Sequence, residues 1–326
     1  MNNKRDIAVD IVKFLAVFLI INSHADVCYP RFSALATGGA IGDSLFLFVS
    51  GFTLFLGKQV RFDNYYKRRI NRIYPSAIAS SLAILLFGGG SSLLDALRLG
   101  CARPFLNAIM IYYVLLYFVR KYAVYRIKWV LMFVGIVTLI VYIFWFPYKY
   151  ETGSKGIYGI TTTFRWIPYF AMMLLGSWVG LHRKSLNYQA KKDFMLFSLC
   201  LVVFYAIQFA AKKWAFIAPY QIITIPFLAG VVFYFYKVCN APIFHKIYSC
   251  RIGNWVVLAV SGLCLESYLT QNLLFTDKLN GIFPLNLFFI YLAVLVLAYF
   301  VRCVARIISL TFKTEDYDWK KVFAIV

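Results

Sequence analysis

The stretch DIAVDIVKFLAVFLIINSH, residues 6–24, decides the fold, because it is an apolar segment that nevertheless carries ionisable side chains. Its length is close to the roughly 20 apolar residues that a helix needs to cross a bilayer. On a helix, Asp10, Lys13 and His24 fall within roughly 60° of one another, and His24 lies roughly 16 Å beyond Lys13. No small-residue cleavage site follows, so the segment is predicted to be a retained first helix. Because ionisable groups inside a membrane are costly, we expect these three to be functional.

The composition of the whole chain extends this prediction. Of the 326 residues, 62% are hydrophobic and 14% are charged, whereas soluble domains average about 45–50% and about 25%. The sequence predicts an all-α, polytopic integral membrane helical bundle in a single domain, 1–326, with the bundle over 1–312 and a short cytoplasmic tail over 313–326. The apolar runs are typical of about ten transmembrane helices, expected over 7–23, 41–57, 74–90, 104–119, 129–147, 165–181, 194–211, 219–236, 254–275 and 284–302.

The charge pattern indicates orientation rather than nucleic-acid binding. The net charge of +21 is spread over short basic runs between the apolar segments. With the amino terminus placed in the cytoplasm, most of the 34 Lys and Arg residues lie on the inner side, as the positive-inside rule expects. Both termini are therefore predicted to be cytoplasmic. The seven cysteines lack CxxC spacing, so neither a metal site nor a disulfide framework is predicted.

A second polar cluster follows the first helix. Ser50 and Gly51 interrupt an apolar segment, where Gly permits close helix approach and Ser can bond across helices. Arg68, Arg69 and Arg72 follow, on a helix expected to enter from the cytoplasm. Guanidinium groups bind phosphate bidentately, which favours an anion site. Ordinary positive-inside anchoring explains the same arginines, and both interpretations stay open.

The histidines suggest where acid–base chemistry would occur. The chain has three, and His182 and His245 lie beside basic residues in segments expected to be solvated cytoplasmic loops. Only His24 is predicted at membrane depth. Imidazole, with an ordinary pKa of about 6.5, is the side chain best suited to take a proton from a hydroxyl. An interfacial histidine bonded at a helix end is the alternative.

The acidic residues at membrane depth have open roles. Asp10 and Lys13 are spaced to neutralise each other, or to help to form a site. Glu266 is expected roughly 18 Å along a helix that begins at residue 254, hence in the outer half of the membrane with His24. Its carboxylate could orient the His24 imidazole, pair with Arg165, or bind sugar hydroxyls.

Taken in order, these motifs resemble the acyltransferase-3 family of integral membrane acyltransferases, which O-acylate cell-surface sugars. The family's acidic residue, basic residue and histidine in the first span are matched by Asp10, Lys13 and His24. Its later motifs are matched by FLFVSGF (residues 46–52), by the arginine pair before a proline (RINRIYP, 69–75), by RWIPYFAMMLLGSWVG (165–180) and by CLESYLTQNLLF (264–275).

Three positions depart from the family pattern. Lys13 stands where the family more often has arginine, which leaves a cationic partner for Asp10 but removes the bidentate fork. The fourth span, MIYYVLLYF (110–118), is only a loose match. Gln271 replaces the histidine of the late span, so His24 remains the main candidate for a catalytic imidazole.

The resemblance implies an O-acyltransferase, most simply an acetyltransferase, in the cytoplasmic membrane. Acetyl-CoA would be the donor, without a metal, and its phosphates would lie near Arg68, Arg69 and Arg72. The acceptor would be a hydroxyl of a cell-surface or lipid-linked glycan, and His24 would act as general base or as acyl carrier. Room for the pantetheine arm is expected beside Ser50 and Gly51.

A polytopic transporter or flippase for a glycan precursor is the alternative to an acyltransferase, since intramembrane charges also mark transport paths. Transporters often contain inverted repeats, and we find none in this sequence. The oligomeric state stays open.

Overall fold

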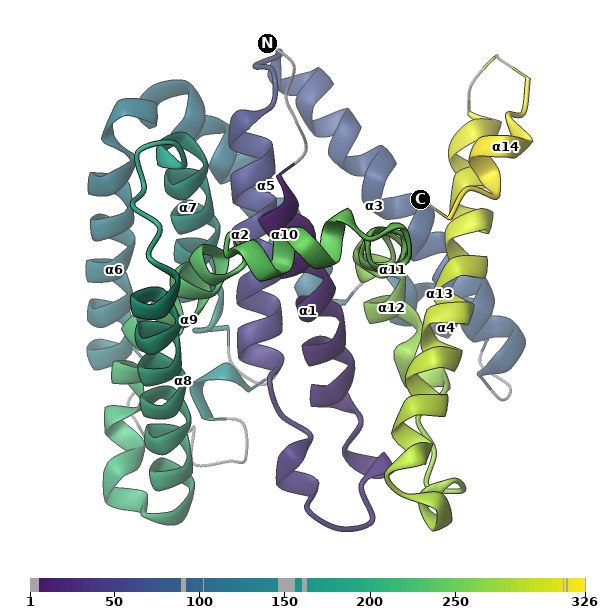
Figure 1. Cartoon of the computed structure of the whole chain (residues 1–326). Helices are drawn as coiled ribbons and strands as arrows, with labels where there is room; N and C mark the ends of the chain where they lie inside the picture. The colour runs from purple at the N-terminus through teal and green to yellow at the C-terminus, as the bar shows by residue number, and fades with distance from the viewer. Residues whose placement is uncertain are drawn as a thin grey trace. The chain divides into compact units, whose positions relative to one another are not determined.

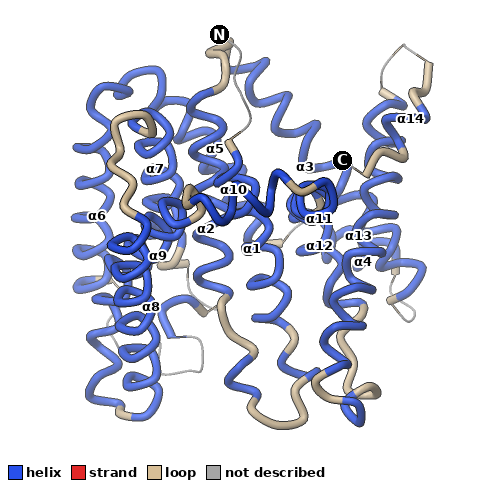
Figure 2. Tube along the Cα trace, viewed as in Figure 1, coloured by secondary structure: helices blue, strands red, loops and turns tan. Residues whose placement is uncertain are grey.

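The computed structural model describes residues 6–88, 92–101, 103–145, 156–159, 163–312, 314 and 316–325. Across these ranges the regular structure is helical, as Figure 2 shows, which confirms the all-α prediction. The chain forms two compact units. The first unit contains Met1–Val12, Asp43–Lys58 and Leu115–Ser249, and the second contains Lys13–Gly42, Gln59–Val114 and Cys250–Val326.

Helix pairs build the first unit (Figure 1). Helix α8 packs along α9 and joins it through a 3₁₀ segment, while α6 packs against α7. Most of α2 and the end of α5 also belong to this unit. The bounds are α2 Gly39–Leu56, α5 Pro104–Ala123, α6 Ile127–Phe144, α7 Trp166–His182, α8 Ala190–Lys213, the 3₁₀ segment Ala215–Ile223, α9 Thr224–Val238 and α10 Pro242–Ser249.

In the second unit, α3 is the central element and packs against α4, α12 and α13. Small buried side chains from Ala79, Ala83, Val301 and Ala305 let α3 and α13 approach closely. The short α14 contacts α13. The bounds are α1 Ile7–His24, which enters this unit after Val12, α3 Phe62–Phe87, α4 Leu93–Cys101, α11 Arg251–Gly262, α12 Cys264–Thr270, α13 Leu285–Thr311 and α14 Trp319–Val322.

The described part of the chain contains fewer helices that are long and apolar enough to span a membrane than the ten predicted from the sequence. Within the described ranges, seven segments are long and apolar enough, or eight if one bent pair is a single span. The segment Pro104–Phe144 contains α5 and α6, which the sequence predicted as two separate spans. Helix α7, with 17 residues, is too short to be counted. The chain is therefore multi-pass, while the count of ten and the cytoplasmic termini stay predictions. The seven are Ile7–His24, Ser33–Leu56, Phe62–Phe87, Pro104–Phe144, Ala190–Lys213, Ala215–Val238 and Leu285–Thr311.

One predicted span is wrong as a single straight helix. Residues 254–275 were expected to be continuous, but the chain bends by 53° between α11 and α12. Figure 1 shows α11 nearly end-on, whereas α13 of the same unit is seen from the side. A Cβ atom at Gly262 would lie 2.6 Å from Arg302 Nη1, so the break leaves space for that guanidinium. Helix breaks at membrane depth are tolerated where they are buried in protein or line a cavity.

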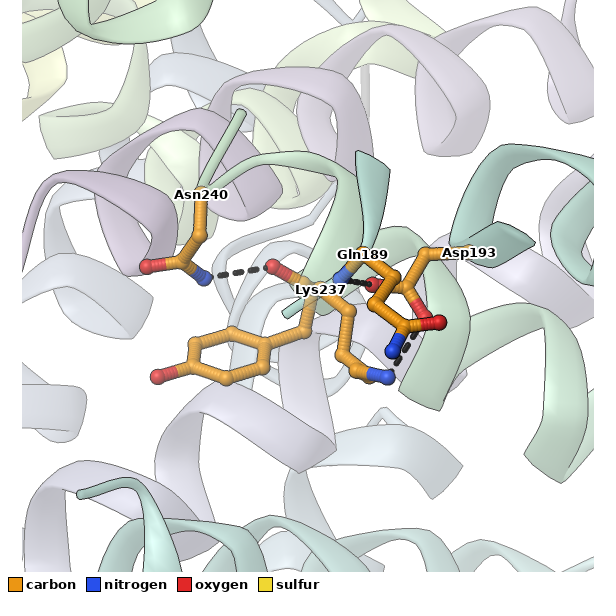
Figure 3. Close-up of polar contacts among 5 residues, drawn as sticks. Gln189, Asp193, Lys237 and Asn240 are labelled. Carbon is orange, nitrogen blue, oxygen red and sulfur yellow. Dashed lines mark hydrogen bonds and ion pairs between the residues drawn. The ribbon is translucent and has the colours of Figure 1, made fainter. Parts of the chain in front are cut away.

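A buried ion pair fastens α8 to α9 (Figure 3). The Asp193 carboxylate binds Lys237 Nζ and also accepts a hydrogen bond from the backbone N–H of Gln189 at 2.8 Å. At the end of α9, Asn240 Nδ2 donates to the Tyr236 carbonyl at 2.8 Å. At the start of α8 a backbone N–H group, and at the end of α9 a backbone carbonyl, are therefore hydrogen-bonded by side chains.

Replacing Lys237 by alanine is expected to lower the free energy of unfolding by about 3 kcal/mol, because it leaves a buried carboxylate without its cation. Thermal unfolding in detergent measures the change, and Lys246→Ala, at an exposed position, is the matched control. An unchanged melting temperature for Lys237→Ala would show that the pair does not stabilise the α8–α9 hairpin.

Candidate functional site

The acid–base pair predicted in α1 spans the boundary between the units. Asp10 belongs to the first unit and is 2% exposed, and its Oδ2 accepts a hydrogen bond from the Tyr248 hydroxyl at 3.1 Å. Lys13 begins the second unit and is half-buried. The Asp10 carboxylate therefore has a hydroxyl partner that the sequence did not reveal. Nothing in the pattern near residue 248 signals that contact.

His24 is the last residue of α1, and its ring is held by the preceding turn. Its Nδ1 lies 2.9 Å from the Ile20 carbonyl oxygen and 3.1 Å from Ser23 Oγ. A carbonyl oxygen can only accept, so Nδ1 carries the hydrogen in this contact. The neutral imidazole then has its basic lone pair on Nε2. This is the tautomer that a general base requires.

The chain that follows His24 is anchored by Asn22, which sequence reasoning missed. Asn22 Nδ2 donates to the Leu35 and Thr37 carbonyls at 2.7 and 2.9 Å. Its Oδ1 accepts from the hydroxyls of Tyr29 and Tyr291, both at 2.6 Å. Burial raises the pKa of the Tyr29 hydroxyl, which keeps it a donor. The end of α1 is thus fixed to the loop after it and to α13.

On one side of α12, Tyr268 faces His24. The two rings make a T-shaped contact with their centroids 6.4 Å apart. Arg103 stacks over the Tyr268 ring at 5.4 Å and donates to the Tyr268 and Leu269 carbonyls at 3.0 and 2.7 Å. A cation there complements the carboxyl end of α12. Burial lowers the pKa of the guanidinium of Arg103, a residue that the sequence did not single out.

Glu266 lies on the opposite side of α12, since residues two apart on a helix point about 200° apart. Its carboxylate is 1% exposed and its Oε1 accepts from Ser76 Oγ at 2.8 Å. Arg302 of α13 interacts with it electrostatically. Ser76 is one turn along α3 from Arg72. The straight helix from residue 254, on which the depth predicted for Glu266 depended, is wrong, and that depth stays a prediction.

Arg165, which sequence reasoning considered as a partner for Glu266, belongs to the first unit and interacts there with Asp43. Asp43 also interacts with Tyr169. Sequence reasoning missed Asp43, although it is the only acidic residue in the predicted span 41–57 and so carried a detectable signal.

The three arginines of α3 do not share one environment. Arg68 and Arg72 are exposed, and Arg69 is half-buried. The Arg69 guanidinium stacks on Tyr65 and Tyr113 at 5.6 and 5.9 Å from the ring centroids. Arg69 and Arg72 are three residues apart and share a helix face, whereas Arg68 is rotated by about 100° from Arg69. Their role in binding phosphate stays a prediction.

Ser50 and Gly51 lie in the first unit, where α2 meets α7. A Cβ atom at Gly51 would lie 1.8 Å from the Met173 carbonyl oxygen, and one at Gly176 would lie 1.9 Å from the Phe48 carbonyl oxygen. The two backbones therefore touch, and the space expected for a pantetheine arm beside Gly51 is filled by α7. Close helix packing explains this glycine.

His182 also differs from its expected place in a solvated loop. It ends α7, is half-buried and stacks on Trp178 with ring centroids 5.1 Å apart. Its Nδ1 lies 2.8 Å from the Trp178 carbonyl oxygen, a contact of the same kind as that of His24 Nδ1 with the Ile20 carbonyl oxygen. The same Nδ1 contact therefore occurs at the end of another helix, so the tautomer alone does not identify a catalytic histidine. What distinguishes His24 is its contact with the broken span.

Comparison with known proteins adds one finding. A family model described as an acyltransferase domain, of the acyltransferase-3 type, matches residues 6–306. No curated protein and no solved structure was found to match the chain. The matched range includes every residue of the site described above.

Proposed function

Because the chain belongs to the acyltransferase-3 family and is a multi-pass membrane acyltransferase, we propose that it transfers an acetyl group from acetyl-CoA to a hydroxyl of a cell-surface or lipid-linked glycan. The observation that carries this proposal is the position of His24 against Tyr268. A histidine in the Nδ1–H tautomer lies beside a broken span whose opposite side has a buried carboxylate near arginines.

The residues of the second unit support a direct transfer. His24 Nε2 takes the proton of the acceptor hydroxyl as its oxygen attacks the thioester carbonyl. The tetrahedral intermediate collapses with cleavage of the carbon–sulfur bond, and the proton passes from Nε2 to the leaving thiolate. The products are an O-acetyl ester and CoA. In the alternative route, the same nitrogen holds the acetyl group before the acceptor attacks.

The arginines supply the donor side of the proposal. Arg69 and Arg72 are three residues apart and share a face of α3, and Arg68 adds positive charge to the same turn. We propose that the protein lies in the cytoplasmic membrane. Acetyl-CoA that binds from the cytoplasm would place its phosphates at these arginines. Lys13 and Asp10 would support the first helix. The family match favours this transferase over a transporter or flippase.

The proposal is tested by alkali-labile acetate on envelope glycans from cells with the wild-type gene, with His24→Ala, or with neither. Both proteins must be present at equal levels. Acetate should appear with the wild type and vanish with His24→Ala. If the wild type and the empty control match in a strain with its native glycan, O-acetylation is the wrong reaction.

A further inference from the structure

Positive charge is concentrated at the break between α11 and α12. Arg302 of α13 interacts electrostatically with Arg306, Arg72 and Glu266. Arg306 Nη1 donates to the backbone carbonyls of Val322, at 3.0 Å, and Ala324. The three guanidinium groups exceed the one carboxylate, so this region favours an anionic ligand.

Arg302 differs from Arg306 in what its donors do. Arg302 Nη1 makes one long contact, 3.4 Å, to the Ile325 carbonyl. Its Nε is buried and has no hydrogen-bond partner among the described residues. A buried donor left unpaired is costly, which indicates that Arg302 has capacity for a further acceptor.

Buried polar atoms without partners continue along α12. Glu266 Oε2 and Ser267 Oγ of α12, and Oε1 of Gln271, which begins the 3₁₀ segment Gln271–Leu273 directly after α12, all lack a hydrogen bond to any described group. Each of the three residues is 1% exposed. Ser267 and Gln271 are four residues apart and so lie on one face. From Glu266 to Gln271 the helix rises about 7.5 Å.

The unpaired polar atoms lie between Arg302 and the candidate base His24. At its start, Glu266 lies beside Arg302, and on its other side Tyr268 contacts the His24 ring. At about 100° per residue, Ser267 and Gln271 lie between Glu266 and Tyr268 around the helix axis. A ligand that follows these two residues would therefore pass around α12, from Arg302 toward the candidate base. It would need to offer several hydrogen-bond donors and acceptors and end in negative charge.

We propose that α12 binds the pantetheine arm of the acyl-CoA donor and that Arg302 binds the donor's diphosphate. This inference rests on the proposed function. The amide N–H groups of the arm supply donors for the Glu266 and Gln271 oxygens, and an arm carbonyl accepts from the Ser267 hydroxyl. The guanidinium of Arg302 recognises phosphate oxygens through charge-assisted bonds. The thioester then lies at the His24 end.

The test is equilibrium binding of acetyl-CoA and of S-acetylpantetheine, which lacks the phosphates, to purified protein. Arg302→Gln should weaken acetyl-CoA binding about 10- to 100-fold, as for one lost charge-assisted bond, and leave S-acetylpantetheine unchanged. Gln271→Leu should weaken both. Arg61→Gln removes an exposed cation paired with Asp63 and should change neither.

A second variant separates binding from folding. Gly262→Ala keeps Arg302 but places a methyl group in the space of its Nη1, so it should reproduce the selective loss of acetyl-CoA binding. Melting temperatures report whether each variant folds. If Arg302→Gln and Gln271→Leu bind acetyl-CoA as the wild type does, the inference is wrong while the proposed function stands. If the wild type itself binds no acetyl-CoA, the proposed donor is wrong.

Discussion

Replacing His24 by alanine is expected to lower the rate of acyl transfer about 10²- to 10⁴-fold, the usual contribution of a general base. The reason is geometric, because the Ile20 carbonyl fixes the proton on Nδ1 and leaves Nε2 as the basic atom. The measurement is release of CoA from acetyl-CoA in membranes that contain the acceptor glycan, at equal amounts of folded protein.

His182→Ala is the matched control for this prediction. His182 also ends a helix and has its Nδ1 bound to the carbonyl four residues earlier. Removing it therefore repeats the local change at a helix end without touching α12. A fall with both variants would indicate a structural effect. A rate for His24→Ala close to that of the wild type would exclude both the base and the acyl-carrier role.

Local features of the sequence predicted the parts of the site that depend on a single helix. The 3.6-residue period placed Asp10, Lys13 and His24 on α1, and it placed Arg69 and Arg72 on α3. The length and apolar composition of the runs also predicted a membrane helix at each described segment that is long and apolar enough to cross a bilayer.

Features that depend on distant contacts were not predictable. Ser76, the hydrogen-bond donor to Glu266, lies 190 residues away from it in the chain. The break after Gly262 was not predictable either, since an isolated glycine in an apolar run does not by itself end a helix, and Arg302, which lies against Gly262, comes from another helix. The straight helix assumed from residue 254 gave no sign that Glu266 lies near Arg302.

The glycine at position 51 has two possible explanations when only the sequence is known. A glycine in a membrane span either leaves room for a ligand or lets two backbones meet. The sequence could not separate these, because the second partner, Met173 of α7, is not adjacent in the chain. The structure places the Met173 carbonyl where a Gly51 side chain would be.

Replacing Gly51 by leucine is therefore expected to lower the free energy of unfolding by about 4 kcal/mol, because α2 and α7 must separate to admit the side chain. Gly51→Ala should also lower the free energy of unfolding, but by less. Its Cβ atom would already lie 1.8 Å from the Met173 carbonyl oxygen, and a backbone atom cannot move aside as a side chain can. Thermal unfolding in detergent measures both.

Gly135→Leu is the control, since a Cβ atom there meets nothing within 4 Å. Its melting temperature should stay near that of the wild type, which shows that a larger side chain in a membrane helix is not itself destabilising. If Gly51→Ala instead melts like the wild type and only raises the KM for acetyl-CoA, then the donor does occupy the space beside this glycine. In that event α7 must move away from α2 when the donor binds, since the two backbones otherwise leave no room for it.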